Sequence, residues 1–401
     1  MPILGIQIRY QNSLMRVLCV YATRQIDSNL FMSSTVFRGL KEAGYDIDLA
    51  FAGTANVIED FNRNYSKYFN DISFCEISRS ILKKISDKQS LLRLGYSFYR
   101  HFVADGFSHL SIKNVKKKFG GRKYDCILSF IPPIISGRFA HDIRKGLGLN
   151  EVRLIQFWTD PLSLGRCDSI NEIPKSRLVH KWQEKRLLKF ADKVVFCYPL
   201  LCKMEAELHP SQSHKMIWSD ISFMEHKCGN NDNHNEIPLI GFFGAYQSHV
   251  RNIGPLLQAI ASLPQYNFVI RGDGDLPYDI DYIPNLNIEF GRRPLSEIES
   301  LENECDILLS LSGKSGITHP AGKTFYYASY PKPIIHIGDG VNSGFFKEYI
   351  SGFEDRFVYC DNNANNISDA IKTAVSSLPT FKLKIPQRMN AAVIAKKIIE
   401  E

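Results

Sequence analysis

The 401-residue sequence lacks any apolar run close to the roughly 18 residues that a membrane-spanning helix needs. Its start, MPILGIQIRYQNSL, has no basic region, apolar core or cleavage site of the kind found in a secretory signal peptide. The nine cysteines are scattered singly, and Cys197 and Cys202 do not have zinc-knuckle spacing. An odd, dispersed set indicates reduced thiols that fill the core of a cytoplasmic protein.

Complete phosphate-binding motifs are also missing. Gly322-Lys323-Thr324 resembles the end of a P-loop, but the glycine required five residues before the Gly-Lys pair is Ile317. The stretch RGDGD at 271–275 lacks the third glycine of a dinucleotide fingerprint and is expected to make a tight turn. The sequence therefore argues against an NTPase of the P-loop class.

Metal-ligand patterns are sparse. His180 and Glu184 lie four residues apart on one predicted helix, but no further Asp/His cluster completes a metal site. The aspartates of 271–275 do not complete the spacing of an EF-hand. We therefore predict no metal and no other cofactor.

What is present is a regular alternation of apolar runs and helical stretches. Several runs are apolar throughout, which is typical of parallel strands that are covered on both faces. The strand candidates are 17–21, 47–51, 126–130, 154–157, 194–197, 239–243, 268–270, 307–311, 334–337 and 357–359. The helix candidates are 34–43, 177–190, 254–262, 321–330 and a last one from about 386. This order predicts an α/β chain with doubly wound parallel sheets.

Positive charge is concentrated in one segment, residues 61–123. It contains fourteen basic and four acidic side chains, a balance of +10 against +7 for the whole chain, and aromatic residues lie among them. A nucleic-acid surface would need a recognisable binding module, and none is present. Two interpretations stay open: a solvated helical face, or docking to anionic lipid, where each basic residue adds about 1 kcal/mol.

Two stretches resemble one family closely. PLIGFFGAYQSHVRNIGPLLQAIASLPQYNFVIRGDGD at 238–275 has a strand, a glycine turn, a basic residue, a helix and a strand ending in Gly-x-Gly. ECDILLSLSGKSGITHPAGKTFYYASYPKPIIHIGDG at 304–340 has a strand, a loop, a Pro-x-x-Lys helix start and a Lys-Pro pair before the next strand. Together they resemble the donor half of GT-B glycosyltransferases, and family 4 most closely. MRVLCVYATRQ, LIQFWTDPLSL and FADKVVFC are consistent with the acceptor half.

The resemblance implies a GT-B fold, in which two Rossmann-like domains face a central cleft. The polar, asparagine-rich segment 225–236 is then the linker between an acceptor-binding domain, 1–224, and a domain that binds the nucleotide sugar, 237–384. The remaining residues, 385–401, are expected to form a helix that crosses back to the first domain.

The same resemblance implies where the donor binds. The loop from Gly316 to Lys323 would lead into a helix N-terminus, where unpaired backbone N–H groups attract the diphosphate of a nucleotide sugar. Lys323 would add a point charge, and Arg251 matches the family's basic residue after the glycine turn at Gly244. Gly272 closes the second glycine turn. Both basic side chains are expected to be exposed, so that their loss should change stability little.

Other positions have two possible roles. Thr318 and Tyr326 match the family's pair of glutamates, and neither is a carboxylate, although the Tyr326 hydroxyl can donate a hydrogen bond. His319 is either a helix N-cap or a phosphate ligand. Asp160, before Pro161, is either a base that accepts the acceptor's hydroxyl proton or a cap in an Asp-Pro turn.

The functional hypothesis is a metal-independent, retaining glycosyltransferase of cell-surface polysaccharide biosynthesis. It would move a sugar from a nucleoside diphosphate sugar to a glycan, with a lipid-linked glycan as the favoured acceptor. A cytoplasmic protein that docks to the inner face of the membrane through 61–123 fits this hypothesis. Two alternatives keep the fold: a non-catalytic subunit that binds glycan or a partner enzyme, and a nucleotide-sugar epimerase.

Overall fold

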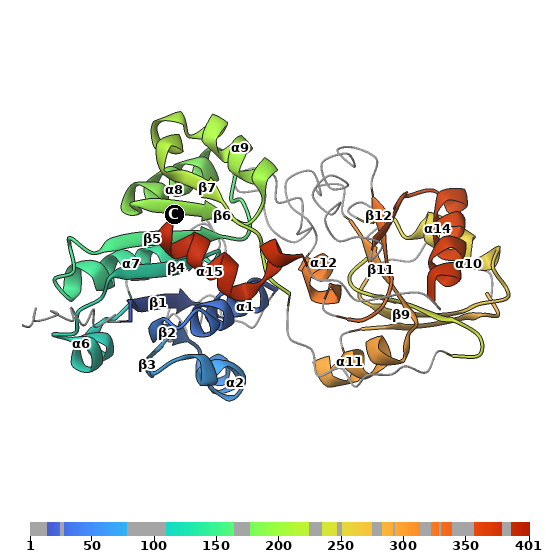
Figure 1. Cartoon of the computed structure of the whole chain (residues 1–401), viewed down its shortest axis with the longest axis horizontal. Coiled ribbons are helices and arrows are strands. Elements are labelled where there is room, and N and C mark those ends of the chain that lie inside the picture. The colour runs from blue at the N-terminus through green and yellow to red at the C-terminus, as the bar shows by residue number, and fades with distance from the viewer. Residues whose placement is uncertain are drawn as a thin grey trace, which may run out of the picture.

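The computed structural model describes residues 14–24, 28–77, 110–163, 177–223, 235–246, 251–274, 283–291, 293–312, 322–328, 330–338, 357–378 and 386–401. Within these residues the chain forms two parallel sheets, each with helices on its faces, which lie side by side along the long axis of the molecule (Figure 1). Most of the linker expected at 225–236 lies outside the described residues, which resume at Asn235.

The first sheet has seven parallel strands, and its central strands are almost wholly buried apolar runs. In spatial order they are β3 (Asp71–Glu76), β2 (Asp46–Gly53), β1 (Arg16–Ala22), β4 (Cys126–Ile131), β5 (Arg153–Trp158), β6 (Lys193–Phe196) and β7 (Met216–Trp218). Its helices are α1 (Ser28–Glu42), α2 (Ala55–Tyr65), α6 (Lys113–Phe119), α7 (Ile134–Gly146), α8 (Arg177–Phe190) and α9 (Pro199–Leu208).

The second sheet has six parallel strands. In spatial order they are β10 (Leu286–Phe290), β9 (Asn267–Gly272), β8 (Leu239–Phe243), β11 (Ile307–Leu311), β12 (Ile334–Gly338) and β13 (Phe357–Asp361). Its helices are α10 (Gly254–Ala261), α11 (Leu295–Glu304), α12 (Gly322–Tyr327) and α14 (Ala364–Ser377). The last helix of the chain is α15 (Ala391–Glu400).

Both sheets have the same winding. In each, the first strand lies in the middle, the next two lie on one side of it, and the chain then crosses to the other side. This is the order of a Rossmann fold, and ligands of such sheets bind outside the carboxyl ends of the strands, where the order reverses. The reversal falls between β1 and β4 in the first sheet and between β8 and β11 in the second. The predicted α/β class with two Rossmann-like domains is therefore confirmed.

Two helices that follow the first sheet in the sequence, α15 and α12, pack against the first sheet's layer. Helix α15 lies on α1 so closely that a Cβ at Gly39 would come within 2.1 Å of the Ala391 carbonyl oxygen. Lys193 Nζ donates to the Ile398 carbonyl at 2.8 Å, at the end of α15 where carbonyls have no partner in the helix. Phe325 and Ala328, from α12 and its end, belong to the first sheet's hydrophobic core. Helix α12 therefore joins the two halves of the molecule (Figure 1).

None of the described helices has both the length and the hydropathy that a bilayer crossing requires.

Candidate functional site

Two glycine turns meet at the carboxyl ends of β8 and β9. The Gly244 amide donates to the Arg271 carbonyl at 3.0 Å. A Cβ at Gly272 would lie 1.9 Å from the Gly244 carbonyl oxygen, and a Cβ at Gly274 would lie 1.7 Å from the Tyr246 carbonyl oxygen. Only glycine fits at both positions. The two turns therefore lie against each other beside the strand reversal between β8 and β11.

Arg251 lies in the loop between β8 and α10 and is half-buried. Its Nη1 atom donates to the Ala245 carbonyl at 3.4 Å, so the side chain folds back against the glycine turn. Its neighbour Asn252 fixes the loop: the Asn252 side-chain oxygen accepts from the Gly254 amide, and its carbonyl accepts from Asn362. The structure thus brings Arg251, Gly244 and Gly272 to one edge of the second sheet.

Lys323 has a different environment. Its Nζ lies 2.8 Å from Glu302 Oε1, and Glu302 is fully buried while the lysine side chain is 36% exposed. The Tyr330 hydroxyl donates to the other Glu302 oxygen at 2.9 Å. The lysine also lies over the rings of Tyr326 and Tyr327, at 4.5 and 4.9 Å from their centroids. A diphosphate would therefore compete with Glu302 for the Lys323 charge.

The helix expected at 321–330 is shorter than predicted. Helix α12 spans Gly322–Tyr327, six residues, because its chain turns at Tyr330 before β12. A helix this short has little macrodipole, so any anion binding there depends on side chains and loop amides. The predicted residues Gly316, Thr318 and His319 lie outside the described residues.

Tyr326, predicted to contact the donor, is only 9% exposed. Its hydroxyl lies 3.5 Å from Glu299 Oε1 on α11. Burial, followed by the charges of Glu302 and Glu299, raises the pKa of this hydroxyl. The side chain therefore stays protonated and packs against α11.

Asp160 follows β5 at the carboxyl edge of the first sheet and is half-buried. The preceding residue is fixed, because the Thr159 amide donates to the Ile131 carbonyl at 2.8 Å and its hydroxyl donates to Asn29 at 3.0 Å. Burial and the nearby Asp160 charge raise the pKa of the Cys197 thiol, which stays protonated. Asp160 thus lies in a well-fixed turn on a different sheet from Arg251 and Lys323.

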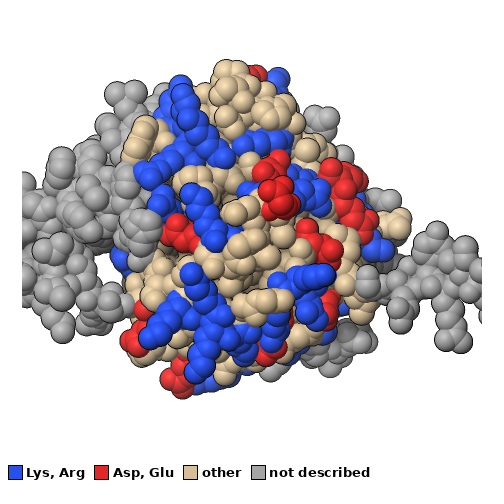
Figure 2. All heavy atoms as spheres, turned by 90° about the vertical axis from the view of Figure 1, so that its left-hand side faces the viewer, with Lys and Arg blue, Asp and Glu red and all other residues tan. Residues whose placement is uncertain are grey.

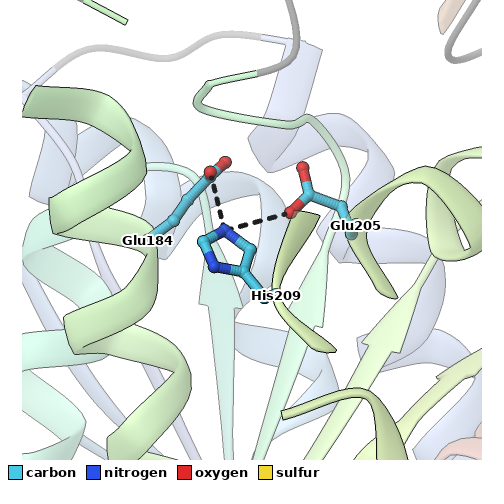
Figure 3. Close-up of side chains that lie close together, drawn as sticks. All are labelled: Glu184, Glu205 and His209. Carbon is cyan, nitrogen blue, oxygen red and sulfur yellow. Dashed lines mark hydrogen bonds and ion pairs between the residues drawn. The ribbon is translucent and has the colours of Figure 1, made fainter. Parts of the chain in front are cut away.

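A buried cluster of titratable groups lies directly behind this turn. Glu184 Oε1 accepts from the amides of Leu162 and Ser163, at 2.6 and 2.9 Å. Its Oε2 lies 3.3 Å from His209 Nε2, which is also 3.7 Å from Glu205 Oε2 (Figure 3). Burial, and then the charge of Glu184, raise the pKa of Glu205 to about 9.

The sequence pattern pointed to a different partner for Glu184. His180 lies one turn away on the same helix, but the histidine that Glu184 contacts is His209, which follows α9. The sequence pattern that could have indicated this cluster is the spacing of four residues between Glu205 and His209. This spacing puts both side chains on one face of a helix end.

The described part of 61–123 includes α6, a short helix with one buried and one basic face. Val115 and Phe119 are buried, while the exposed lysines are Lys113, Lys116, Lys117 and Lys118. Arg122 pairs with the acidic ends of β2 and β3, at 2.9 Å from Asp48 and 2.7 Å from Asp71. Lys and Arg side chains gather on this end of the molecule (Figure 2). Residues 78–109 lie outside the described residues.

No protein-family model matches the chain, and no curated protein is similar enough in sequence to count as a match. Among solved structures, the chain is similar to a glycosyltransferase from Rickettsia africae, with 13% identity and a TM-score of 0.49 over 96% of this chain and 93% of that one. It is also similar to a UDP-N-acetylglucosamine 2-epimerase, with 10% identity and a TM-score of 0.49 over 97% of this chain and 95% of that one. A third similar structure is the glycosyltransferase of kitacinnamycin, with 10% identity and a TM-score of 0.48 over 96% of this chain and 98% of that one.

Proposed function

We propose that the protein is a GT-B glycosyltransferase that moves a sugar from a nucleoside diphosphate sugar to a glycan acceptor. The observation that carries the proposal is the meeting of Gly244, Gly272 and Arg251 beside the β8–β11 reversal. A Cβ at Gly244 would have no neighbour nearer than 3.7 Å, so a phosphate can approach the backbone there, and the adjacent arginine supplies a planar set of donors for its oxygens. A strand reversal is where Rossmann-like sheets bind nucleotides.

In the proposed reaction the sugar's bond to the diphosphate breaks, and negative charge grows on the departing nucleoside diphosphate. Arg251 would stabilise that charge from the glycine turn. Lys323 would contribute by moving its ammonium from Glu302 to a phosphate oxygen, which couples donor binding to the α11–α12 contact. Fixed charges and hydrogen-bond donors of this kind contribute about 10²–10³ each in rate.

The acceptor would approach from the first sheet, where Asp160 follows β5. We expect the anomeric configuration to be retained. In a retaining reaction the leaving phosphate itself can take the acceptor's hydroxyl proton. The donor site would need no metal, because Arg251 and Lys323 would together neutralise the diphosphate in place of a divalent ion. A lipid-linked glycan is the favoured acceptor, since exposed lysines on α6 suit an anionic membrane surface.

The proposal is tested by incubating the protein with UDP, GDP, dTDP and ADP sugars, with and without a crude lipid-linked glycan fraction. A glycosyltransferase releases nucleoside diphosphate only when the acceptor is added, and the acceptor gains mass by one sugar. Conversion of the sugar to its epimer without acceptor would instead indicate an epimerase. A protein that binds none of the nucleotides would be a non-catalytic subunit, and either outcome would overturn the proposal.

A further inference from the structure

The cluster of Glu184, Glu205 and His209 places two carboxyl groups in the protein interior, and one of them has fewer hydrogen-bond partners than its oxygens can take. The three residues are 0, 1 and 3% exposed. Among the residues that the structure describes, neither carboxylate oxygen of Glu205 has a hydrogen-bond partner. An ionised carboxylate in a dry interior is costly unless a cation or several hydrogen-bond donors accompany it. The side chain nevertheless points at the other two members of the cluster (Figure 3).

The distances within the cluster suit a small divalent cation. His209 Nε2 lies 3.3 Å from Glu184 Oε2 and 3.7 Å from Glu205 Oε2, and the three atoms all lie within 4.8 Å of one another. Ligands of a tetrahedral zinc ion, at about 2.0–2.1 Å from the metal, lie about 3.3 Å apart. The two separations from His209 Nε2 are therefore close to those of an occupied site.

The backbone and the hydrogen bonds around the cluster would hold such ligands in place. Glu205 and His209 are four residues apart, and the His209 amide donates to the Glu205 carbonyl at 2.9 Å. Glu184 Oε1 accepts from the Leu162 and Ser163 amides, while Oε2, which faces the cluster, also accepts from the Ser163 hydroxyl. Anchoring of a metal-binding carboxylate by such bonds is a regular feature of metal sites.

We propose that Glu184, Glu205 and His209 bind one structural zinc ion, with water or the Ser163 hydroxyl as the fourth ligand. An imidazole with two carboxylates is a set of nitrogen and oxygen ligands that zinc accepts. The ion would neutralise the buried charge and fix the turn at Leu162 and Ser163. It would touch none of the groups proposed to bind the donor, so the proposal is independent of the proposed transfer reaction.

The test begins with purified full-length protein, loaded with Zn²⁺ and dialysed, in which zinc is measured by elemental analysis. We expect about one equivalent in the wild type and in Glu207→Gln, an exposed residue on the same helix. We expect almost none in Glu205→Gln, which keeps the shape of the side chain and removes its charge. Equal zinc in Glu205→Gln and Glu207→Gln would overturn the proposal, because it would indicate an adventitious ion only.

A second measurement needs no variant and so does not depend on the folding of Glu205→Gln. Metal-free wild type is titrated with Co²⁺, and its absorption is followed. Nitrogen and oxygen ligands should give weak visible bands that saturate at about one equivalent and disappear when Zn²⁺ is added. Absence of saturable bands, or an intense near-ultraviolet band from cysteine thiolates, would also overturn the proposal.

Discussion

Lys323 Nζ lies 2.8 Å from Glu302 Oε1, and this ion pair joins a partly exposed lysine to a carboxylate that has no solvent exposure. Glu302 also accepts a hydrogen bond from the Tyr330 hydroxyl. The pair connects the end of α11 to the start of α12, the helix that contacts both halves of the molecule. The sequence alone predicted an exposed lysine whose loss would leave stability unchanged, and the buried partner changes that expectation.

The first prediction concerns the stability of this pair. Lys323→Ala should lower the free energy of unfolding by about 1–3 kcal/mol, since it leaves a buried carboxylate with one partner fewer. The expected loss of unfolding free energy is smaller than for a fully buried ion pair, because solvent already reaches the lysine. The double variant Lys323→Ala/Glu302→Gln should recover part of the loss, because no buried charge remains. Urea unfolding of the wild type and the variants measures this, and a double variant no more stable than Lys323→Ala would contradict it.

The second prediction concerns Asp160 and the stereochemistry of transfer. Because retention is proposed, the departing phosphate can act as the base, and Asp160→Asn should keep part of the wild-type turnover. An inverting enzyme needs a carboxylate base, and the same variant would then be almost inactive. The product anomer, determined by NMR, identifies the reaction type independently. A retained anomer together with an inactive Asp160→Asn would show that we have misassigned the role of Asp160.

The third prediction concerns pH and a histidine in the second sheet. His336 is 2% exposed on β12, and burial lowers its pKa to about 3. The unfolded chain, with a histidine pKa near 6.5, binds the proton first, so stability should fall as pH drops from about 6.5 towards 3. At pH 5.5 this loss amounts to about 1.4 kcal/mol. His336→Leu should show a shallower decline in unfolding free energy between pH 7 and 5.5, and an unchanged slope would refute the assignment.

The fourth prediction concerns the basic end of the molecule. The protein should sediment with vesicles that contain anionic lipid, and added salt should weaken binding because exposed charges are screened over about 10 Å at 0.1 M. Lys116→Glu/Lys117→Glu on α6 should reduce affinity about tenfold or more. Lys372→Glu, on α14 of the second sheet, is the matched control and should bind normally. If sedimentation depends on neither lipid charge nor salt, the protein does not dock to anionic membranes through this surface.

Much of the fold was predictable because the sequences of central parallel strands are continuous apolar runs. All ten strand candidates correspond to observed strands. The three strands without a candidate, β3, β7 and β10, lie at sheet edges. Polar residues interrupt the apolar runs of β3 and β10, and β7 has only three residues. The apolar runs in the sequence therefore identified the interior strands of both sheets but not three of the edge strands.

The site was less predictable, because its decisive contacts join residues that are distant in sequence. The glycine turns were visible as motifs, but the reason for Gly272 is the Gly244 backbone from another strand. Glu302 lies 21 residues before its partner Lys323, and no local pattern links them. The same applies to Glu184, whose contact with His209 depends on how α8 packs beside α9.

If a nucleotide sugar binds at the glycine turns of the second sheet, loss of Arg251 should weaken nucleotide affinity, which calorimetry measures directly. One of UDP, GDP, dTDP or ADP should bind the wild type and the Lys372→Ala control equally. Arg251→Ala should bind it about 10- to 100-fold more weakly, because a hydrogen bond to a charged group contributes about 1.5–3 kcal/mol. Its unfolding free energy should remain close to that of the wild type. Equal affinity in Arg251→Ala and wild type, or no binding of any of the four, would contradict the account.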